Sequence, residues 1–460
     1  MAETVLVGPS APPRPDLAEL AQRVAGWARP GEQVEAYVAR GRHTSVRVFG
    51  GDVESLSSAE SEGVGIRVIS GHRQGFAYAA SLDPAVVEET LAEARDNAGF
   101  GTVDEYLGLA EPDGVAAADL DLYRPEASSF PTDAKVELAL ELERATKAAD
   151  RRIKGVESAD YGDSEFEGAI ATSTGIRASS RRTVCSLWSS AMADDGRGTQ
   201  TGSGYSVARS PHDLDVARAA TDAARRATRL LGAVKPATQR LTVVLEPSVT
   251  AALTGVLAGL LSGMAALKGR SFLAGKLGEA VASPLLTLVD DPTNPEAYGA
   301  SPFDAEGLAS RGNVLLDAGV VRTFLHNTYT GRRSGVPSTA NAVRGGFKST
   351  PGVGSRALSL APGDLDQEAL LAAIGDGVLV QSVTGMHSGV NGTTGDFSVG
   401  IQGLMVRGGE LAEPVREATV ASTLQRMLGD LVAVGADREW LPGGAAGMTL
   451  AIGDVTLSGS

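Results

Sequence analysis

The sequence predicts an α+β protein with antiparallel sheets and packed helices, organised as two domains over residues 1–235 and 236–460. Two blocks of alternating polar and apolar residues, 34–80 and 155–206, are interrupted by glycines and predict strands joined in hairpins. Helical patterns flank these blocks, which is typical of sheets with segregated helices. The segment AVKPATQ, residues 233–239, interrupts the pattern, so we place the domain boundary near residue 236.

The elements of the first domain follow in order. A Pro-rich lead precedes a short helix over 17–27 that Pro30 and Gly31 end. Antiparallel strands fill residues 34–80, and a helix follows over 84–98. An acidic loop spans 100–130, a helix with alternating charge covers 132–149, and a second set of strands runs from 155 to 206. A helix rich in arginine on one face, 211–232, completes this domain.

The second domain begins with a strand, LTVVLEP, and an uncharged helix over 247–267. On this helix Ala251, Gly255, Gly259 and Gly263 recur every four residues and form one smooth stripe. Glycine costs roughly 1 kcal/mol against alanine inside a helix, so we expect another backbone to pack closely there. A strand over 284–291, a long irregular loop over 291–307, a hairpin turning at 317–319 and a helix over 421–428 follow. A loop of this length usually has a function or covers a site.

Composition excludes several classes of protein. With 43% hydrophobic and 21% charged residues the chain is globular, and its net charge of −15 argues against nucleic acid binding. The single cysteine, Cys185, excludes an intrachain disulfide and is expected to be a small core residue rather than a reactive thiol. The first residues contain Glu3 and no long apolar run, so we expect no signal peptide and a cytoplasmic location. Residues 247–267 are long enough to span a membrane, but their threonines, serines and glycines argue against it.

Few residues carry obvious chemistry. The five histidines, at 43, 72, 212, 326 and 387, lie too far apart in sequence for two to bind a metal from one helical turn. His387 lies in a glycine-flanked loop with Asn391, Thr394 and Asp396, which either lines a cleft or bonds its own turns. Arg332 and Arg333 follow Tyr329 and either clamp a peptide carboxylate or form a solvated or interface pair. We identify no catalytic residue and no metal ligand.

Several ordered motifs resemble the TldD/PmbA peptidase family. They are GVGIRV at 63–68, GFA at 75–77, SFLAGKLGE at 271–279, the run from 313 to 346 and TGDFSVGIQG at 394–403. In the zinc-bearing TldD subunits a helix before the SFLAGKLGE-like tail carries HExxxH. The same register places that motif on residues 254–259, where Thr254, Gly255 and Gly259 replace histidine, glutamate and histidine. The chain therefore resembles the zinc-free partner, TldE or PmbA.

The resemblance implies a subunit without a cofactor of its own, paired in a heterodimer with a TldD-like subunit that carries the zinc. Such pairs cleave unfolded peptides and trim leader or modified peptides in natural-product biosynthesis, and this chain would shape the substrate cleft. Two alternatives stay open. One is a self-sufficient homodimeric hydrolase that uses His387, Asp396 or Arg333, and the other is a binding or scaffold protein without catalysis.

Overall fold

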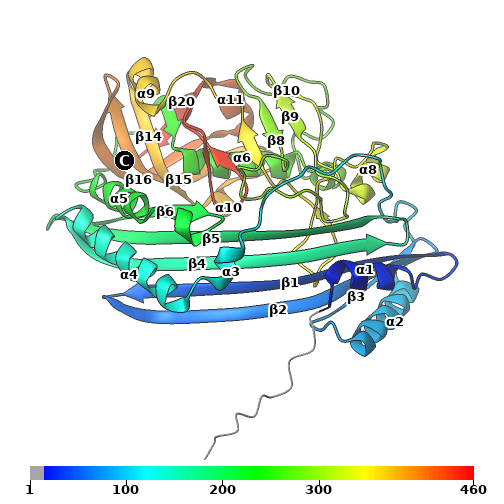
Figure 1. Cartoon of the computed structure of the whole chain (residues 1–460). Coiled ribbons are helices and arrows are strands. Elements are labelled where there is room, and N and C mark those ends of the chain that lie inside the picture. Colours follow the sequence, from blue (N-terminus) through cyan, green and yellow to red (C-terminus); the bar gives the residue numbers. More distant parts are fainter. Residues whose placement is uncertain (1–14, 460) are drawn as a thin grey trace, which may run out of the picture.

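The first half of the chain folds around one long antiparallel sheet. The computed structural model describes residues 15–459, so the Pro-rich lead and the expected absence of a signal peptide concern residues outside the described part. The sheet has the order β3-β2-β1-β4-β5-β6 and forms the elongated lower layer of Figure 1. Its strands are β1 (Glu32–Phe49), β2 (Asp52–Ser70), β3 (Arg73–Ala79), β4 (Ile153–Thr172), β5 (Arg177–Asp194) and β6 (Thr199–Ala208).

Two pairs of helices pack on this sheet. The first pair is α1 (Leu17–Ala25) and α2 (Pro84–Phe100), and the second is α4 (Thr132–Ala149) and α5 (Val216–Thr228). A short helix, α3 (Pro125–Ser129), and a 3-10 turn at Pro211–Asp213 lie in the connections. Helices α1 and α2 bury apolar residues against one end of β1, β2 and β4, whereas α4 and α5 pack towards the other end. Asp83 caps the N-terminus of α2 by accepting a hydrogen bond from the amide of Ala85, and Pro84 is its first residue.

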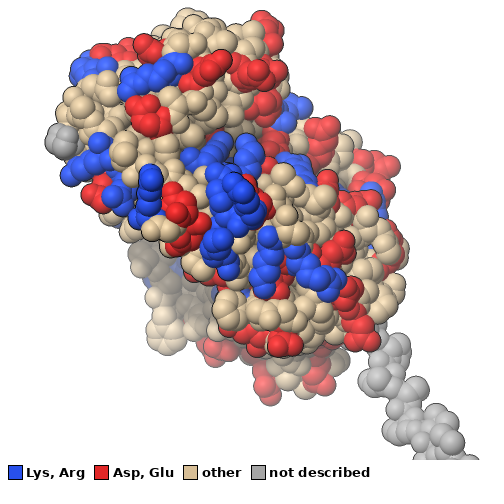
Figure 2. Space-filling view, turned by 90° about the vertical axis from the view of Figure 1, so that its left-hand side faces the viewer, with Lys and Arg blue, Asp and Glu red and all other residues tan. Residues whose placement is uncertain are grey.

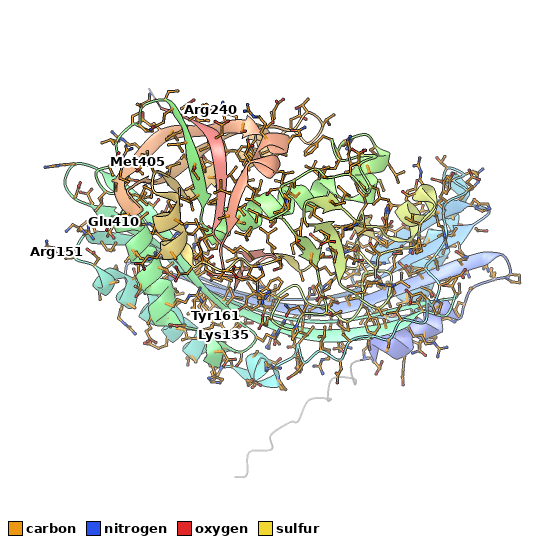
Figure 3. The ribbon with its side chains drawn as sticks, turned by 90° about the horizontal axis from the view of Figure 1, so that it is seen from above. Lys135, Arg151, Tyr161, Arg240, Met405 and Glu410 are labelled. Atoms are coloured by element: carbon orange, nitrogen blue, oxygen red, sulfur yellow. The ribbon has the colours of Figure 1, made fainter. Side chains whose placement is uncertain are left out.

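A buried charge holds α4 on the sheet. The ammonium of Lys135 lies 2.5 Å from the carboxylate of Asp163, which also accepts a hydrogen bond from the hydroxyl of Tyr161 at 2.9 Å. Figure 3 labels Lys135 and Tyr161 close together on the helix-bearing side of the sheet. Because this lysine is already paired with a buried carboxylate, it has a structural role in the fold.

The second half of the chain forms a barrel-like sheet. Its order is β16-β15-β14-β7-β20-β17, and an additional pairing of β16 with β20 joins the two sides. Among the described strands of this sheet, β7 and β14 pair in parallel and the other pairs are antiparallel. The strands are β7 (Gln239–Leu245), β14 (Gly377–Thr384), β15 (Asp396–Arg407), β16 (Glu410–Thr423), β17 (Leu431–Val434) and β20 (Leu450–Ser458). This sheet lies above the first one in Figure 1, with α6 (Pro247–Leu260) against it.

Shorter elements complete this half. A four-stranded sheet has the order β10-β9-β8-β13, and two small hairpins pair β11 with β12 and β18 with β19. Their bounds are β8 (Leu288–Asp290), β9 (Asn313–Asp317), β10 (Val320–Val321), β13 (Leu358–Leu360), β11 (Ala342–Val343), β12 (Gly352–Val353), β18 (Glu439–Trp440) and β19 (Ala446–Gly447). The remaining helices are α7 (Gly263–Leu267), α8 (Thr328–Ser334), α9 (Gln367–Ile374), α10 (Met386–Gly389) and α11 (Leu424–Gly429).

The α+β class with antiparallel sheets is confirmed, and the proposed division at residue 235/236 falls between α5 and β7. One predicted helix is wrong in its length. The uncharged segment 247–267 forms two helices, because Ser262 makes a β-bridge with Leu325 and the amide of Gly263 donates to the carbonyl of Leu325 at 2.8 Å. A bond from a residue so distant in sequence leaves no periodic signal. None of the helices within residues 15–459 is long and apolar enough to cross a membrane.

The two halves interlock through glycines of β2. A Cβ atom at Gly63 would lie 2.5 Å from the ring of Phe347, and one at Gly65 would lie 2.2 Å from the carbonyl oxygen of Phe347. Both contacts are too close for any side chain. The motif GVGIRV therefore forms a socket for Phe347 of the second half, which explains its two glycines.

Candidate functional site

The uncovered face of α6 is the first candidate site. This helix buries Leu253, Leu257 and Leu260 in the core of the barrel-like sheet, which leaves the opposite side exposed. The exposed side carries Ala252, Gly255 and Gly259, and we call these three residues the α6 face. A Cβ atom at Gly255 or Gly259 would meet no other atom within 4 Å. No described residue of this chain packs on Gly255 or Gly259, and Ala251 of the predicted stripe is buried, so the four positions do not form one smooth face. Close packing by the backbone of another chain stays a prediction.

Gly263, the last member of the predicted stripe, has a different environment. A Cβ atom here would lie 2.3 Å from the Nδ1 atom of His326 and 3.0 Å from the carbonyl oxygen of Leu325. The imidazole of His326 is buried and lies 3.2 Å from the hydroxyl of Thr330. Burial lowers the pKa of His326. The glycine at this position is required by the chain's own packing, whereas those of the α6 face are not.

The α6 face offers no zinc ligands. Thr254 is buried, and its hydroxyl donates to the carbonyl of Ala251 in its own helix at 2.9 Å. Gly255 and Gly259 have no side chain. No group of three or more His, Cys, Asp or Glu side chains within residues 15–459 has the geometry of a metal site. The residues at these positions do not fit a zinc ion, which needs three or four nitrogen, sulfur or carboxylate ligands.

The loop between β14 and β15 lies beside the end of α6. Gly392 contacts the side chain of Leu260, and its carbonyl accepts a hydrogen bond from the amide of Phe272 at 2.9 Å. The four predicted residues His387, Asn391, Thr394 and Asp396 are all exposed on this loop. The structure therefore brings them close to the degenerate zinc motif.

Three of these four side chains form a local network. The amide oxygen of Asn391 accepts hydrogen bonds from the backbone amides of Thr393 and Thr394 at 2.9 and 3.2 Å. The hydroxyl of Thr394 donates to Asp396 at 2.6 Å. His387 makes no hydrogen bond with any described residue, so its imidazole is free for a ligand or a partner.

The second predicted group, on α8, connects the two halves of the chain. The hydroxyl of Tyr329 donates to Asp104 at 2.8 Å, and the guanidinium of Arg332 donates to the carbonyl of Leu109 at 2.9 Å. Arg333 donates to the hydroxyl of Tyr329 at 3.1 Å. The backbone amide of Tyr106 and the hydroxyl of Tyr329 donate hydrogen bonds to Asp104, and these bonds lower the pKa of its carboxyl group. No bond joins this group to the loop at 385–396 within the described residues.

Ion pairs further fix the halves together. Figure 2 shows Lys and Arg side chains gathered between the upper and lower parts of the molecule, on the face where α5 lies. Both Arg226, on α5, and Arg229, at its end, pair with the buried carboxylate of Glu246, the residue before α6. In a second cluster the buried carboxylate of Glu35 pairs with Arg67 at 2.5 Å and with Arg344 at 2.8 Å.

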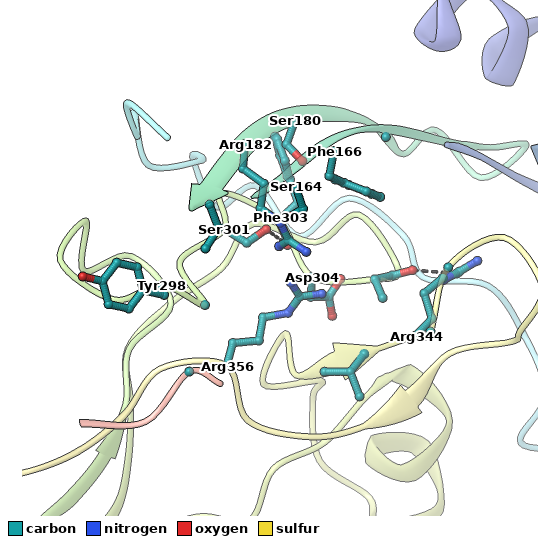
Figure 4. A pocket seen from close by; sticks show the side chains of 18 of the residues that line it. Ser164, Phe166, Ser180, Arg182, Tyr298, Ser301, Phe303, Asp304, Arg344 and Arg356 are labelled. Atoms are coloured by element: carbon teal, nitrogen blue, oxygen red, sulfur yellow. Dashed lines mark hydrogen bonds between the residues drawn. The ribbon is translucent and has the colours of Figure 1, made fainter. Parts of the chain in front are cut away.

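One large cavity in the described part of the chain was not predicted from the sequence. It has a volume of about 680 Å³ and lies between the face of β4 and β5 and the loops of the second half. The long irregular loop at 291–307, for which we expected a site, lines one wall of it. Arg182 and Arg356 reach into this cavity (Figure 4). Their sequence contexts, SSRRT and GSRA, carry no signal beyond charge, because only the fold brings them together.

Comparison with known proteins identifies the family. Three consecutive family profiles match: PmbA/TldA metallopeptidase domain 1 over residues 34–98, the central domain over 125–231 and the C-terminal domain over 238–459. The chain belongs to the PmbA/TldD metallopeptidase family. This chain is similar to the metalloprotease PmbA of Escherichia coli O157:H7, with 29% identity over 88% of each chain.

Solved structures of PmbA/TldD proteins share the fold. A crystal structure from Thermotoga maritima, described as a candidate modulator of a DNA gyrase, matches with a TM-score of 0.87 and 27% identity over 96% of this chain and 99% of its own. The structure of TldE from Thermococcus kodakarensis matches with a TM-score of 0.86 and 22% identity over 93% and 97% of the two chains. At 22% identity the second match supports the fold alone.

Proposed function

We propose that this chain is the zinc-free subunit of a two-subunit peptidase in which a TldD-like partner carries the zinc. The substrates in this proposal are unfolded, leader or modified peptides. The chain contributes one wall of the substrate cleft, formed by the α6 face and the loop at 385–396. An extended peptide can add to an exposed strand edge through backbone hydrogen bonds, which is a common mode of peptide recognition.

One observation carries the proposal. Helix α6 keeps a solvent-open side, and on that side stand Gly255 and Gly259, the positions that the family resemblance assigns to the general base and to one of the two histidine ligands. An uncovered helix face of small residues lets another chain approach closely. The neighbouring loop adds the unbonded imidazole of His387. The arrangement suits a wall of a shared cleft better than a complete hydrolase.

Elemental analysis tests the metal part of the proposal. The chain, purified alone after exposure to zinc and dialysis, is expected to hold much less than one zinc ion per molecule. A variant with Thr254→His, Gly255→Glu and Gly259→His is the matched control, because it restores all three motif residues, two of them on the open face and one at the buried Thr254. One tightly retained zinc ion in the unmodified chain would contradict the assignment.

Reconstitution tests the partner. We expect no hydrolysis of an unfolded peptide by the chain alone and measurable hydrolysis after mixing with a TldD-like subunit. The complex should appear in light scattering as one copy of each chain. Activity of the chain alone would favour a homodimeric hydrolase, whereas inactivity of the mixture despite complex formation would favour a binding protein.

A further inference from the structure

The large cavity contains an unbalanced pair of positive charges. Arg182 enters from β5 and Arg356 from the segment before β13, and Figure 4 shows their guanidinium groups directed into the same space. Neither guanidinium has an ion pair or a hydrogen bond with any residue within 15–459, and the Nε atom of Arg356 is buried without a partner. Burial, together with the nearby charges of Arg356 and Arg209, lowers the pKa of Arg182.

The acidic groups near the cavity are already used. Glu35 pairs with Arg67 and Arg344. The carboxylate of Asp304 accepts backbone hydrogen bonds from three residues, Glu306, Leu308 and Ala342, at 2.9 to 3.0 Å. Burial and the neighbouring Glu306 raise the pKa of Asp304 to about 7, so it is a weak counterion at neutral pH. The buried carboxylate of Asp290 lies near Arg356, but it accepts hydrogen bonds from the backbone amides of Arg356 and Ala357 and from the side chain of Asn341. In a chain with net charge −15, two arginines without an ion pair among the described residues are a cost to the unliganded fold.

The rest of the cavity is built for a ligand with an apolar body. Phe166, Tyr298 and Phe303 line it, and the guanidinium of Arg182 lies 5.0 Å from the ring of Phe166. The hydroxyls of Ser164 and Ser180 also face it and have no hydrogen-bond partner among the described residues. A volume of about 680 Å³ falls in the usual range for ligand sites.

We propose that this cavity binds a carboxylate group of a peptide through Arg182 and Arg356. The carboxylate comes from the C-terminus of the peptide or from an acidic side chain, since both present the same two oxygens to a planar guanidinium. The apolar wall then holds the adjoining residues. Exposed residues at the rim, Ser179, Gly345 and Pro442, leave the cavity open from outside. The inference rests on the proposed function, because it defines which peptides the subunit holds.

The test measures binding to the full chain without its partner. Fluorescence anisotropy compares one labelled pentapeptide with a free C-terminus, the same peptide amidated, and the amidated peptide with one internal glutamate. We expect the free acid or the glutamate peptide to bind about tenfold or more tightly than the neutral amide, since a charge-assisted pair is worth at least one factor of ten. Arg182→Gln and Arg356→Gln should each remove this preference.

Arg181→Gln is the matched control. Arg181 is the neighbour of Arg182 on β5, but its guanidinium is exposed and lies over the ring of Tyr123, near Glu165. This variant should keep the preference. The melting temperatures of Arg182→Gln and Arg356→Gln should equal or exceed that of the unmodified chain, because each removes an unpaired, half-buried charge. Loss of binding with a lower melting temperature in both variants would overturn the proposal.

Other outcomes of these measurements would also overturn or support the cavity proposal. Equal binding of all three peptides would overturn the proposal, and so would binding of succinate or inorganic phosphate with no preference among the peptides. If the preference and its loss in the two variants are found, the cavity assignment stands even where the reconstituted pair fails to cleave peptides. If the reconstituted pair cleaves peptides but the chain shows no preference for a carboxylate, the proposed function stands and the cavity has no part in it.

Discussion

In the loop at 385–396, substitutions of single side chains can distinguish a structural role from a functional one. Asn391 bonds two backbone amides, so Asn391→Ala removes interactions that hold the loop. His387 has no such bond. We expect His387→Ala to lower peptidase activity of the reconstituted pair with an unchanged melting temperature. Asn391→Ala should lower both, by about 0.5–1.5 kcal/mol in stability for a lost hydrogen bond. Unchanged activity in His387→Ala would exclude this histidine from the cleft.

Cys185 gives a second prediction at this scale. The thiol is buried, which confirms its expected place in the core. Burial, with the nearby carboxylate of Asp163, raises the pKa of the Cys185 thiol to about 12. Since the thiolate is the reacting species, alkylation by iodoacetamide at pH 8 should be on the order of a thousandfold slower in the folded chain than in denaturant. Rapid labelling of the folded chain would contradict the buried thiol.

Residue chemistry was only partly accessible from the sequence. The replacement of a zinc motif by Thr254, Gly255 and Gly259 stays a prediction that rests on the register of the family resemblance, which needs no coordinates. The hydrogen bond between Arg332 and Leu109 and the place of Arg182 in the cavity could not be predicted, since each depends on segments that are distant in sequence.

At the scale of elements, the glycines of the former stripe should behave differently. Gly263→Ala places a Cβ atom against His326 and should cost about 1–3 kcal/mol of stability through overpacking. Gly259→Ala meets open space on a helix and should gain up to roughly 1 kcal/mol. Denaturant unfolding of both variants checks the difference. Equal effects would mean that the break between α6 and α7 does not fix the packing at Gly263.

The α6 face yields a separate prediction about assembly. Gly259→Leu should leave the isolated chain folded, with an unchanged melting temperature, and prevent complex formation with a TldD-like subunit. Gly99→Leu on α2 is the matched control, since Gly99 is likewise exposed on a helix with no atom within 4 Å of a Cβ. It should assemble normally. Normal assembly of Gly259→Leu would place the subunit interface elsewhere.

Elements with local signals were predictable. Helix α4 occupies Thr132–Ala149, the range expected from its charge pattern, and the strands of the first sheet lie where alternation places them. The predicted helix at 421–428 was wrong at its start, because Ala421 pairs with both Ser398 and Thr456 as part of β16. Pairing with two neighbouring strands overrides local helix preference.

At the scale of the whole molecule, the buried cluster around Glu35 joins the halves. Burial alone would raise the pKa of Glu35, but Arg67 and Arg344 hold it below its usual value. Its contribution to stability is therefore present above the unfolded pKa near 4.5 and is lost as pH falls through the lower folded value. Glu35→Gln leaves two buried arginines without their carboxylate and should cost about 3–5 kcal/mol in denaturant unfolding near pH 7.

Glu167→Gln on the neighbouring β4 is the control for that change. Glu167 makes a more exposed pair with Arg40 at 3.5 Å, and its loss should cost at most about 1 kcal/mol. The difference between the two variants should shrink in acid, where Glu35 itself becomes protonated. A pH-independent difference would show that the cluster acts through packing rather than charge.

Because Gly63 and Gly65 precede Phe347 in the sequence, the ribosome makes the socket before the side chain that fills it. Phe347 is translated about 280 residues after the strand that receives it. At ribosomal rates of roughly 5–20 residues per second, the nascent sheet must wait roughly 15–60 s before its aromatic plug emerges. During that interval the narrow hollow between two glycines is exposed on a strand with nothing to fill it. A chaperone that covers the emerging sheet would protect it during that interval.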